Sequence, residues 1–242
     1  MKDGNFFYEQ YNKLNWIKQK NNKINYSVMD FIIDNIFLKD KIENIKIFDI
    51  GFGTGNFFEK IENKINNFSK KNIIAGCEPA IKNYKFVKNK ITKFKNIKLK
   101  ISNKSFLETS FKNKFNYIAA IYVFPHFVVK DFSKIIKKIK IMLEKKGKFI
   151  LVISKDLDLK NNEIVNDKKY NFINQEDFVF KGKKYKQFLH TTKIKNVGNI
   201  AGYRRSEQFY IDLFLKNDFS LIEKKYIKNN EFNSAVLVFS RK

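Results

Sequence analysis

Hydrophobic positions along this chain follow two alternating patterns. Short continuous runs rich in Ile, Val and Phe, such as IKIFDI at residues 45–50, are typical of buried strands. Between these runs, apolar side chains recur at spacings of three and four, which predicts amphipathic helices. The predicted strands are residues 45–50, 72–77, 97–101, 115–123 and 148–153, and the predicted helices are 54–65, 84–91 and 131–143. Such alternation predicts a parallel sheet with helices on both faces.

Different patterns precede and follow this region. Residues 5–40 carry aromatic and aliphatic side chains at helical spacing, and we interpret residues 1–40 as an N-terminal helical lid. The periodicity is lost over residues 156–203, whose short β-like pieces predict a small antiparallel cap. A helix at 206–216 is followed by strands at 219–227 and 234–240, which should pair antiparallel because no helix separates them.

The predicted fold is one α/β domain over residues 1–242. Its sheet has seven mostly parallel strands with an antiparallel last strand, and helices cover both faces. The β-rich cap is inserted between strands five and six, so it should emerge at the end of the sheet where ligands of α/β domains bind.

Composition changes this picture only in part. The chain has 49 Lys plus Arg against 24 Asp plus Glu, a formal charge of +25, which invites a nucleic-acid partner. Only Arg204, Arg205 and Arg241 are arginine, however, and the lysines are dispersed rather than gathered in one block. Because nucleic-acid sites favour the bidentate arginine fork, we interpret the charge mainly as background composition, and nucleic acid stays a possible but not favoured partner.

Cysteine and histidine are scarce. Cys77 is the single cysteine, and His126 and His190 are the only histidines, so we expect neither a disulfide framework nor a metal site. The longest apolar run, residues 117–129, is interrupted by Pro125 and is shorter than the roughly 18 residues that a membrane span needs. No apolar signal segment opens the chain, and we therefore expect a soluble, cytoplasmic protein without a membrane span.

The most informative segment follows the first predicted strand. Asp49 precedes a turn, Gly51-Phe52-Gly53-Thr54-Gly55, that leads into a helix, so a ligand can lie against bare backbone there. The nicotinamide fingerprint wants a small residue where this chain has Asn56, and a P-loop would need Gly-Lys-Ser/Thr. Asp49 would also repel phosphates, and it suits a ligand that carries an ammonium group.

A second acid, Glu78, stands before Pro79 at the end of the next strand, where a carboxylate can accept both hydroxyls of a ribose. The glycine turn, Asp49 and Glu78 together resemble the Rossmann-like class I S-adenosylmethionine-dependent methyltransferases. The resemblance continues through Ser105-Phe106 after the third strand and through residues 115–127, although Asn116 replaces the usual aspartate. It covers about residues 42–154 and 206–240.

The resemblance implies S-adenosylmethionine as cofactor and a role for each matching position. Asp49 and the backbone of residues 51–55 would hold the methionine end, Glu78 with Pro79 the ribose, and Ser105 with Phe106 the adenine. Tyr122, which leaves the fourth strand, would border the methyl group. The implied cofactor-binding residues are Asp49, Gly51, Phe52, Gly53, Gly55, Glu78, Pro79, Ser105, Phe106 and Tyr122. Asn103 is an alternative to Ser105 on the adenine side.

Candidates for the acceptor side come from the turn after the fourth strand and from the cap. His126 and His190 are candidate bases, each weighed against a packing role. Arg204 or Arg205 could bind a carboxylate or phosphate of the substrate, with Tyr203 beside them, or could be surface charges at a helix start. Tyr11, with Tyr8 and Trp16, could close over the site as a lid or pack on the sheet. The candidate substrate-contacting residues are Tyr11, Tyr203 and Arg204.

The favoured function is therefore methyl transfer from S-adenosylmethionine to an oxygen or nitrogen of a small molecule. Cytosine C5 methylation loses support because Cys77 lies in the second strand, and adenine N6 methylation because Ile121-Tyr122-Val123-Phe124 lacks the Asn/Asp-Pro-Pro-aromatic run. An RNA- or ribosome-binding protein, including an RNA methyltransferase, is the alternative. A partner subunit that keeps the fold without methylating is a third possibility.

Overall fold

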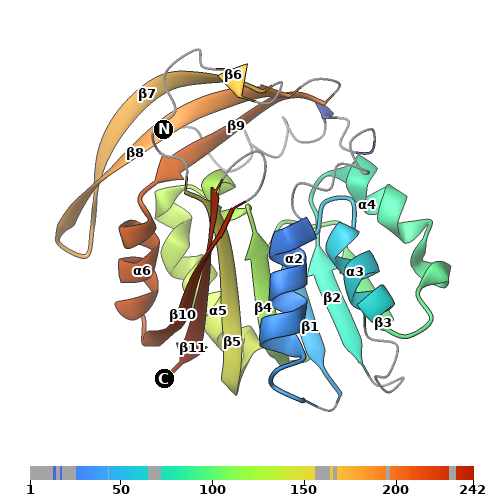
Figure 1. Cartoon of the computed structure of the whole chain (residues 1–242). Coiled ribbons are helices and arrows are strands. Elements are labelled where there is room, and N and C mark those ends of the chain that lie inside the picture. Colours follow the sequence, from blue (N-terminus) through green and yellow to red (C-terminus); the bar gives the residue numbers. More distant parts are fainter. Residues whose placement is uncertain are drawn as a thin grey trace.

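The computed structural model describes residues 13, 14, 17, 26–42, 44–64, 72–155, 164–165, 168–194, 197–228 and 233–242. The predicted lid residues Tyr8, Tyr11 and Trp16 lie outside these described residues. Figure 1 shows a central twisted sheet with helices on either side and a second, smaller sheet above its upper end. These two sheets position every candidate residue discussed below.

Within the described residues the central sheet has seven strands in the order β10-β11-β5-β4-β1-β2-β3. β11 runs antiparallel to both β10 and β5, and the remaining pairs are parallel, which confirms the predicted topology. The strands are β1 Lys46–Ile50, β2 Ile73–Cys77, β3 Lys98–Ser102, β4 Phe115–Ile121, β5 Leu143–Ser154, β10 Phe219–Lys228 and β11 Asn233–Arg241. β5 begins earlier than predicted because Leu143 already pairs with Phe115 ahead of a register shift.

Helices cover both faces of this sheet, as the apolar periodicity predicts (Figure 1). α2 (Tyr26–Ile32), the π-helical turn η3 (Ile33–Phe37), α3 (Asn56–Lys64) and α4 (Ile81–Lys88) contribute side chains to one core cluster. α5 (Phe132–Met142) and α6 (Glu207–Leu215) contribute to the other, in which Phe149, Phe214 and Phe239 stack on one another. The short 3-10 turns are η4 Ile91–Lys93, η5 Phe124–His126 and η6 Val129–Asp131.

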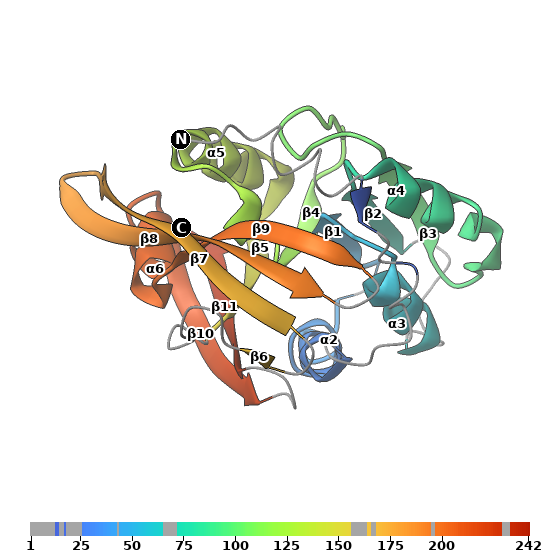
Figure 2. The same cartoon turned by 90° about the horizontal axis from the view of Figure 1, so that it is seen from above.

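The second sheet is the cap, and it is antiparallel in the order β6-β7-β8-β9. Its strands are β6 Ile164–Val165, β7 Lys168–Phe180, β8 Lys183–Ile194 and β9 Gly198–Arg205. β7 and β8 are joined by Lys181-Gly182, both at positive φ, which is the tight turn whose twist matches a hairpin. Viewed from above, the cap lies across the carboxyl ends of the central strands (Figure 2). β9 continues through Ser206 into α6, so the cap is inserted between β5 and β10 as predicted.

None of the helices in the described parts of the chain is long and apolar enough to cross a membrane. Over the same residues, no group of three or more His, Cys, Asp or Glu side chains is arranged to hold a metal ion.

Candidate cofactor and acceptor site

The glycine turn after β1 has a backbone that only glycine adopts easily at three alternating positions. Gly51, Gly53 and Gly55 have φ of 68°, 56° and 79°, all in the left-handed region. The N–H of Gly51 donates to the carbonyl of Cys77 at 2.8 Å, so the turn is fixed to the end of β2. The three glycines are therefore spaced as they are because each of these positions needs a left-handed backbone conformation.

Space around the turn distinguishes the three glycines. A Cβ on Gly51 would lie 2.8 Å from a methyl group of Val123, and one on Gly55 would lie 2.9 Å from a methyl group of Val87. A Cβ on Gly53 would have no heavy atom within 4 Å. The turn is thus packed at both ends and open in the middle, where a ligand can approach the main chain.

Glu78 closes the other side of this opening and is 4% exposed. One carboxylate oxygen accepts from the N–H of Gly53 at 2.8 Å, and the other accepts from the N–H of Ala80 at 2.9 Å. Because each oxygen has two lone pairs, the carboxylate can accept further hydrogen bonds from a ligand. Burial raises the pKa of Glu78 to about 7, even though these N–H donors oppose the shift.

Asp49, on β1, is 3% exposed and lies next to Gly76 in the sheet register. Burial, followed by the charge of Glu78, raises the pKa of Asp49 well above its usual value. β1 and β2 approach closely here, because a Cβ on Gly76 would lie 2.8 Å from the carbonyl oxygen of Asp49. Two buried acids beside an open glycine turn favour a ligand that brings positive charge.

A further polar atom at the turn fits a ligand with N–H groups. Oδ1 of Asn56, the first residue of α3, is buried and has no hydrogen-bond partner within the described residues. Sequence reasoning used Asn56 only to argue against a nicotinamide site, although its place after the last glycine was a usable signal. The open turn, two acids and this acceptor suit S-adenosylmethionine, with Asp49 and Asn56 toward its ammonium group and Glu78 toward its ribose.

The loop after β3 is held mainly by its own side chains. Nδ2 of Asn103 donates to the carbonyl of Glu78 at 2.8 Å and so supports the end of β2. The hydroxyl of Ser105 donates to Glu108 at 2.6 Å, and the N–H of Ser105 donates to the same oxygen at 3.1 Å. The ring of Phe106 lies in the hydrophobic core, 5.9 Å from that of Phe48. Both side chains thus shape the loop, and their role toward adenine stays a prediction.

Tyr122 leaves β4 in a strained conformation. Its φ of 57° lies in the left-handed region, which is unusual for a residue with a bulky side chain. Its backbone N–H donates to the carbonyl oxygen of Val152 at 3.0 Å. Its hydroxyl lies 2.5 Å from the hydroxyl of the fully buried Ser234 on β11. Tyr122 therefore reaches the carboxyl end of β5 and the amino end of β11, where Ser154 pairs with Ser234. A strained residue at such a place is typical of functional sites.

The two histidines, far apart in sequence, lie together. Nδ1 of His126 is 3.0 Å from the carbonyl oxygen of Ala201 on β9, so Nδ1 carries the proton and Nε2 is an acceptor. His190 pairs in register with Gly202, and a Cβ on Gly202 would already be 3.4 Å from the His126 ring. Burial lowers the pKa of His126 to about 4 and that of His190 to about 3, with Arg204 and then His126 adding to the latter shift. Both imidazoles are neutral at neutral pH.

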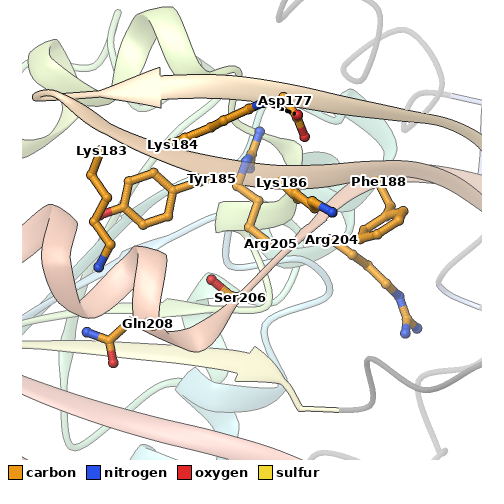
Figure 3. Close-up of a pocket in the computed structure, with 10 residues that line it drawn as sticks. All are labelled: Asp177, Lys183, Lys184, Tyr185, Lys186, Phe188, Arg204, Arg205, Ser206 and Gln208. Carbon is orange, nitrogen blue, oxygen red and sulfur yellow. Dashed lines mark ion pairs between the residues drawn. The ribbon is translucent and has the colours of Figure 1, made fainter.

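The three consecutive residues Tyr203, Arg204 and Arg205 alternate across β9, as strand residues do. Tyr203 is 1% exposed and packs with Val128 and Leu189. Arg204 faces the opposite side of β9, and both Arg204 and Arg205 line a groove beneath the cap hairpin, where their side chains run in different directions (Figure 3). The structure therefore places Arg204 where a ligand can reach it, and places Tyr203 in the packing of the cap.

Arg205 has a structural role beside the candidate site that the sequence did not reveal. It is 3% exposed, and its Nη2 and Nη1 donate to the carbonyls of Phe127 at 2.9 Å and Phe124 at 3.3 Å. Its Nε donates to Gln187 at 2.8 Å, and Gln187 in turn donates to Glu176 at 3.0 Å. Arg205 thus fastens the cap to the turn that follows β4. The alternation of side chains along a strand could have indicated that Arg205 is buried, but only if β9 had been predicted to extend through residue 205.

This fold and this site define a class of protein. A sheet of this order, a glycine turn after its first strand, and buried acids on its first strand and just after its second are typical of α/β domains that bind a nucleoside-containing ligand at the carboxyl ends of their strands.

Comparisons with known proteins agree. Residues 48–151, which include both acids and the turn but less than half of the chain, match the family model described as a methyltransferase domain. Residues 48–151 are therefore similar to a methyltransferase domain, and the site described above fits S-adenosylmethionine as the cofactor of such a domain. No curated protein matches the chain significantly.

Solved structures with low identity share the fold. A Clostridium acetobutylicum S-adenosylmethionine-dependent methyltransferase has 15% identity and a TM-score of 0.61, with 88% of this chain and 90% of that one covered. Magnesium protoporphyrin IX methyltransferase from Synechocystis with bound S-adenosylmethionine has 11% identity and a TM-score of 0.64, with 100% and 98% covered. The 1,6-didemethyltoxoflavin-N1-methyltransferase of Burkholderia thailandensis has 8% identity and a TM-score of 0.58, with 86% and 76% covered.

Proposed function

We propose that the protein transfers the methyl group of S-adenosylmethionine to an oxygen or nitrogen of a small molecule that binds beneath the cap. The observation that carries this proposal is the attachment of the cap. Arg205 and His126 join β9 to the turn after β4, which holds the cap across the carboxyl ends of the central strands (Figure 2). A covered site at the ends of the strands suits a small acceptor.

Methyl transfer mainly requires that the acceptor atom be aligned with the methyl group of the cofactor. The cofactor supplies a methyl group on a sulfonium, and its transfer is an in-line displacement that needs no nucleophilic residue of the enzyme. Tyr122 and the histidine pair would orient the acceptor atom. A neutral imidazole of pKa about 3 to 4 is a weak base, but it can still take the proton of a hydroxyl that has just been methylated, because a protonated ether is a far stronger acid.

A relative with a small acceptor supports the same reading. The Burkholderia protein was solved with bound 1,6-didemethyltoxoflavin and S-adenosylhomocysteine, and this chain shares its fold. The dispersion of lysines argues in the same direction, because a net charge of +25 without an arginine-rich block is a weak signal for RNA.

Two measurements test the proposal. Calorimetric titration with S-adenosylhomocysteine should give one site, and Glu78→Ala should weaken it by about 1.5–3 kcal/mol, the range for hydrogen bonds to a charged group. Incubation with methyl-labelled S-adenosylmethionine and separated cellular fractions should then place label in small metabolites. Label that appears instead in RNA, lost in Glu78→Ala, would move the RNA methyltransferase alternative to first place.

A further inference from the structure

The loop that follows β3, residues 103–109, is fastened to α5 by the side chain of Lys138. Nζ of Lys138 donates to the carbonyl oxygen of Leu107 at 3.0 Å and also to the carbonyl oxygen of Thr109. The same ammonium group lies 5.2 Å from the centre of the Phe106 ring, which packs in the core cluster beneath α5. Lys138 therefore contacts the loop at three of its residues.

Lys138 differs from the neighbouring lysines of its helix. Lys134 and Lys137 of α5 are exposed, whereas Lys138 is partly buried. Burial lowers the pKa of Lys138, because the charged form loses hydration there. Both of its hydrogen bonds are charge-assisted and go to main-chain carbonyls. The lysine therefore restrains the course of the loop backbone rather than one side chain.

The loop transmits this restraint through its own hydrogen bonds. The hydroxyl of Thr109 donates to the carbonyl of Ser105 at 2.9 Å, and the hydroxyl of Ser105 donates to Glu108 at 2.6 Å. Because Ser105 is bonded to both residues, a displacement of the Thr109 main chain also moves Ser105. The conformation of the whole turn at residues 105–109 thus depends on the lysine.

This loop adjoins the acid that faces the ribose. Nδ2 of Asn103 donates to the carbonyls of Glu78 at 2.8 Å and Pro79 at 3.2 Å, and the glycine turn bonds to Glu78 through Gly53 from its other side. A nucleoside whose ribose hydroxyls meet Glu78 has its base on one side and its 5′ substituent on the other. Since the glycine turn takes the ammonium-bearing substituent, the base lies toward residues 103–109.

We propose that Lys138 is a positioning residue for the cofactor, which holds the loop in the conformation that recognises adenine and so sets the selectivity for this base. It acts through the main chain of the loop. This inference rests on the proposed function, since it takes S-adenosylmethionine as the cofactor. Adenine offers an amino donor and a ring-nitrogen acceptor where hypoxanthine offers the reverse pair, so a loop with fixed hydrogen-bonding groups distinguishes them and a loosened loop does not.

Calorimetric titration with S-adenosylhomocysteine and with its hypoxanthine analogue, S-inosylhomocysteine, tests the proposal. The wild-type protein should prefer the adenine compound by roughly tenfold or more, the equivalent of one mispaired hydrogen bond. Lys138→Met should lose most of this preference through weaker binding of the adenine compound, with little change for the analogue. Lys138→Arg keeps the charge and the donors and should restore the preference in part. Lys138→Gln should show a smaller loss in the same direction, and it carries the test alone if Lys138→Met does not fold.

The matched control is Lys137→Met, which removes the adjacent exposed lysine of α5. It should keep both affinities, and urea unfolding of every variant separates stability from selectivity. If Lys138→Met is less stable but keeps the wild-type preference, Lys138 is only structural and the proposal is wrong. It is equally wrong if the wild-type protein binds both compounds alike, or if Lys137→Met changes the preference as much. In these cases S-adenosylhomocysteine still binds and the proposed function stands, whereas a wild-type protein that does not bind it overturns the proposed function itself.

Discussion

The glycine turn and the cap are held in place by different means. The turn at residues 51–55 takes its shape from glycines at left-handed positions and from a bond to the adjacent strand end. The cap is held by side chains whose carbonyl partners are 75 to 81 residues away in the sequence, through His126 and Arg205. Local sequence therefore specifies the cofactor site, and tertiary contacts specify the acceptor site.

This difference has a functional consequence. The cofactor is the same for every methyltransferase of this class, so a locally encoded turn serves all of them. Methyl acceptors differ between these enzymes. Because the cap is a separate sheet attached along one strand, substitutions in it can reshape the groove while β1, β2 and β4 keep their positions. In this chain Arg204 and Arg205 both line the groove, but the hydrogen bonds to the turn after β4 come from Arg205.

The largest effect should follow from breaking the attachment of the cap. Arg205→Met keeps an unbranched, flexible side chain but leaves the buried carbonyls of Phe124 and Phe127 without their donor. Each unsatisfied acceptor costs about 1–3 kcal/mol, so the free energy of unfolding should fall by at least that amount. Urea unfolding measures the loss, and amide exchange should accelerate at residues 124–127 and 198–205.

The neighbouring substitution Arg204→Met is the matched control. Arg204 faces the groove rather than the body of the protein, so its removal should change stability by no more than about 0.5 kcal/mol. Equal losses for the two variants would mean that Arg205 does not fasten the cap.

The cofactor turn can be tested by comparing Gly51→Ala with Gly53→Ala. Both alanines would have a left-handed φ, at about 1–2 kcal/mol each. Only the alanine at Gly51 would also clash with Val123, which adds about 1–3 kcal/mol of overpacking. Thermal unfolding should therefore rank Gly51→Ala as the less stable variant, whereas Gly53→Ala should mainly weaken S-adenosylhomocysteine, because its methyl group enters the open part of the turn.

A second substitution checks the stated cause. Val123→Ala should recover part of the loss in Gly51→Ala and none of the loss in Gly53→Ala, which a double-mutant cycle resolves. Failure of this rescue would assign the cost at Gly51 to backbone strain alone.

The same contrast explains which features the sequence predicted. The strands and helices of the central sheet follow from periodicity, and the glycine turn follows from the ability of glycine to adopt the left-handed conformations that the turn requires. Periodicity did not reveal that Phe106 enters the core, because aromatic residues occur throughout the chain. Arg205 was interpreted as a substrate ligand or a surface charge at a helix start. Its burial depends on β9 reaching residue 205 and on the turn at residues 124–127, a contact that no local pattern encodes.

The smallest effect we expect is a proton released when the cofactor binds. Glu78 has a pKa of about 7 in the folded protein, above its usual 4.5, because burial disfavours the carboxylate. Its contribution to the stability of the free protein is therefore complete below pH 4.5 and is lost as the pH rises through 7. Ribose hydroxyls and a cationic ligand both favour the carboxylate, so binding lowers this pKa and should release a fraction of a proton near pH 7. Calorimetry in two buffers of different ionisation enthalpy measures that fraction, and Glu78→Gln should abolish it. Asp49 also has a raised pKa and faces the same ligand, so a release that persists in Glu78→Gln would assign the proton to Asp49 instead.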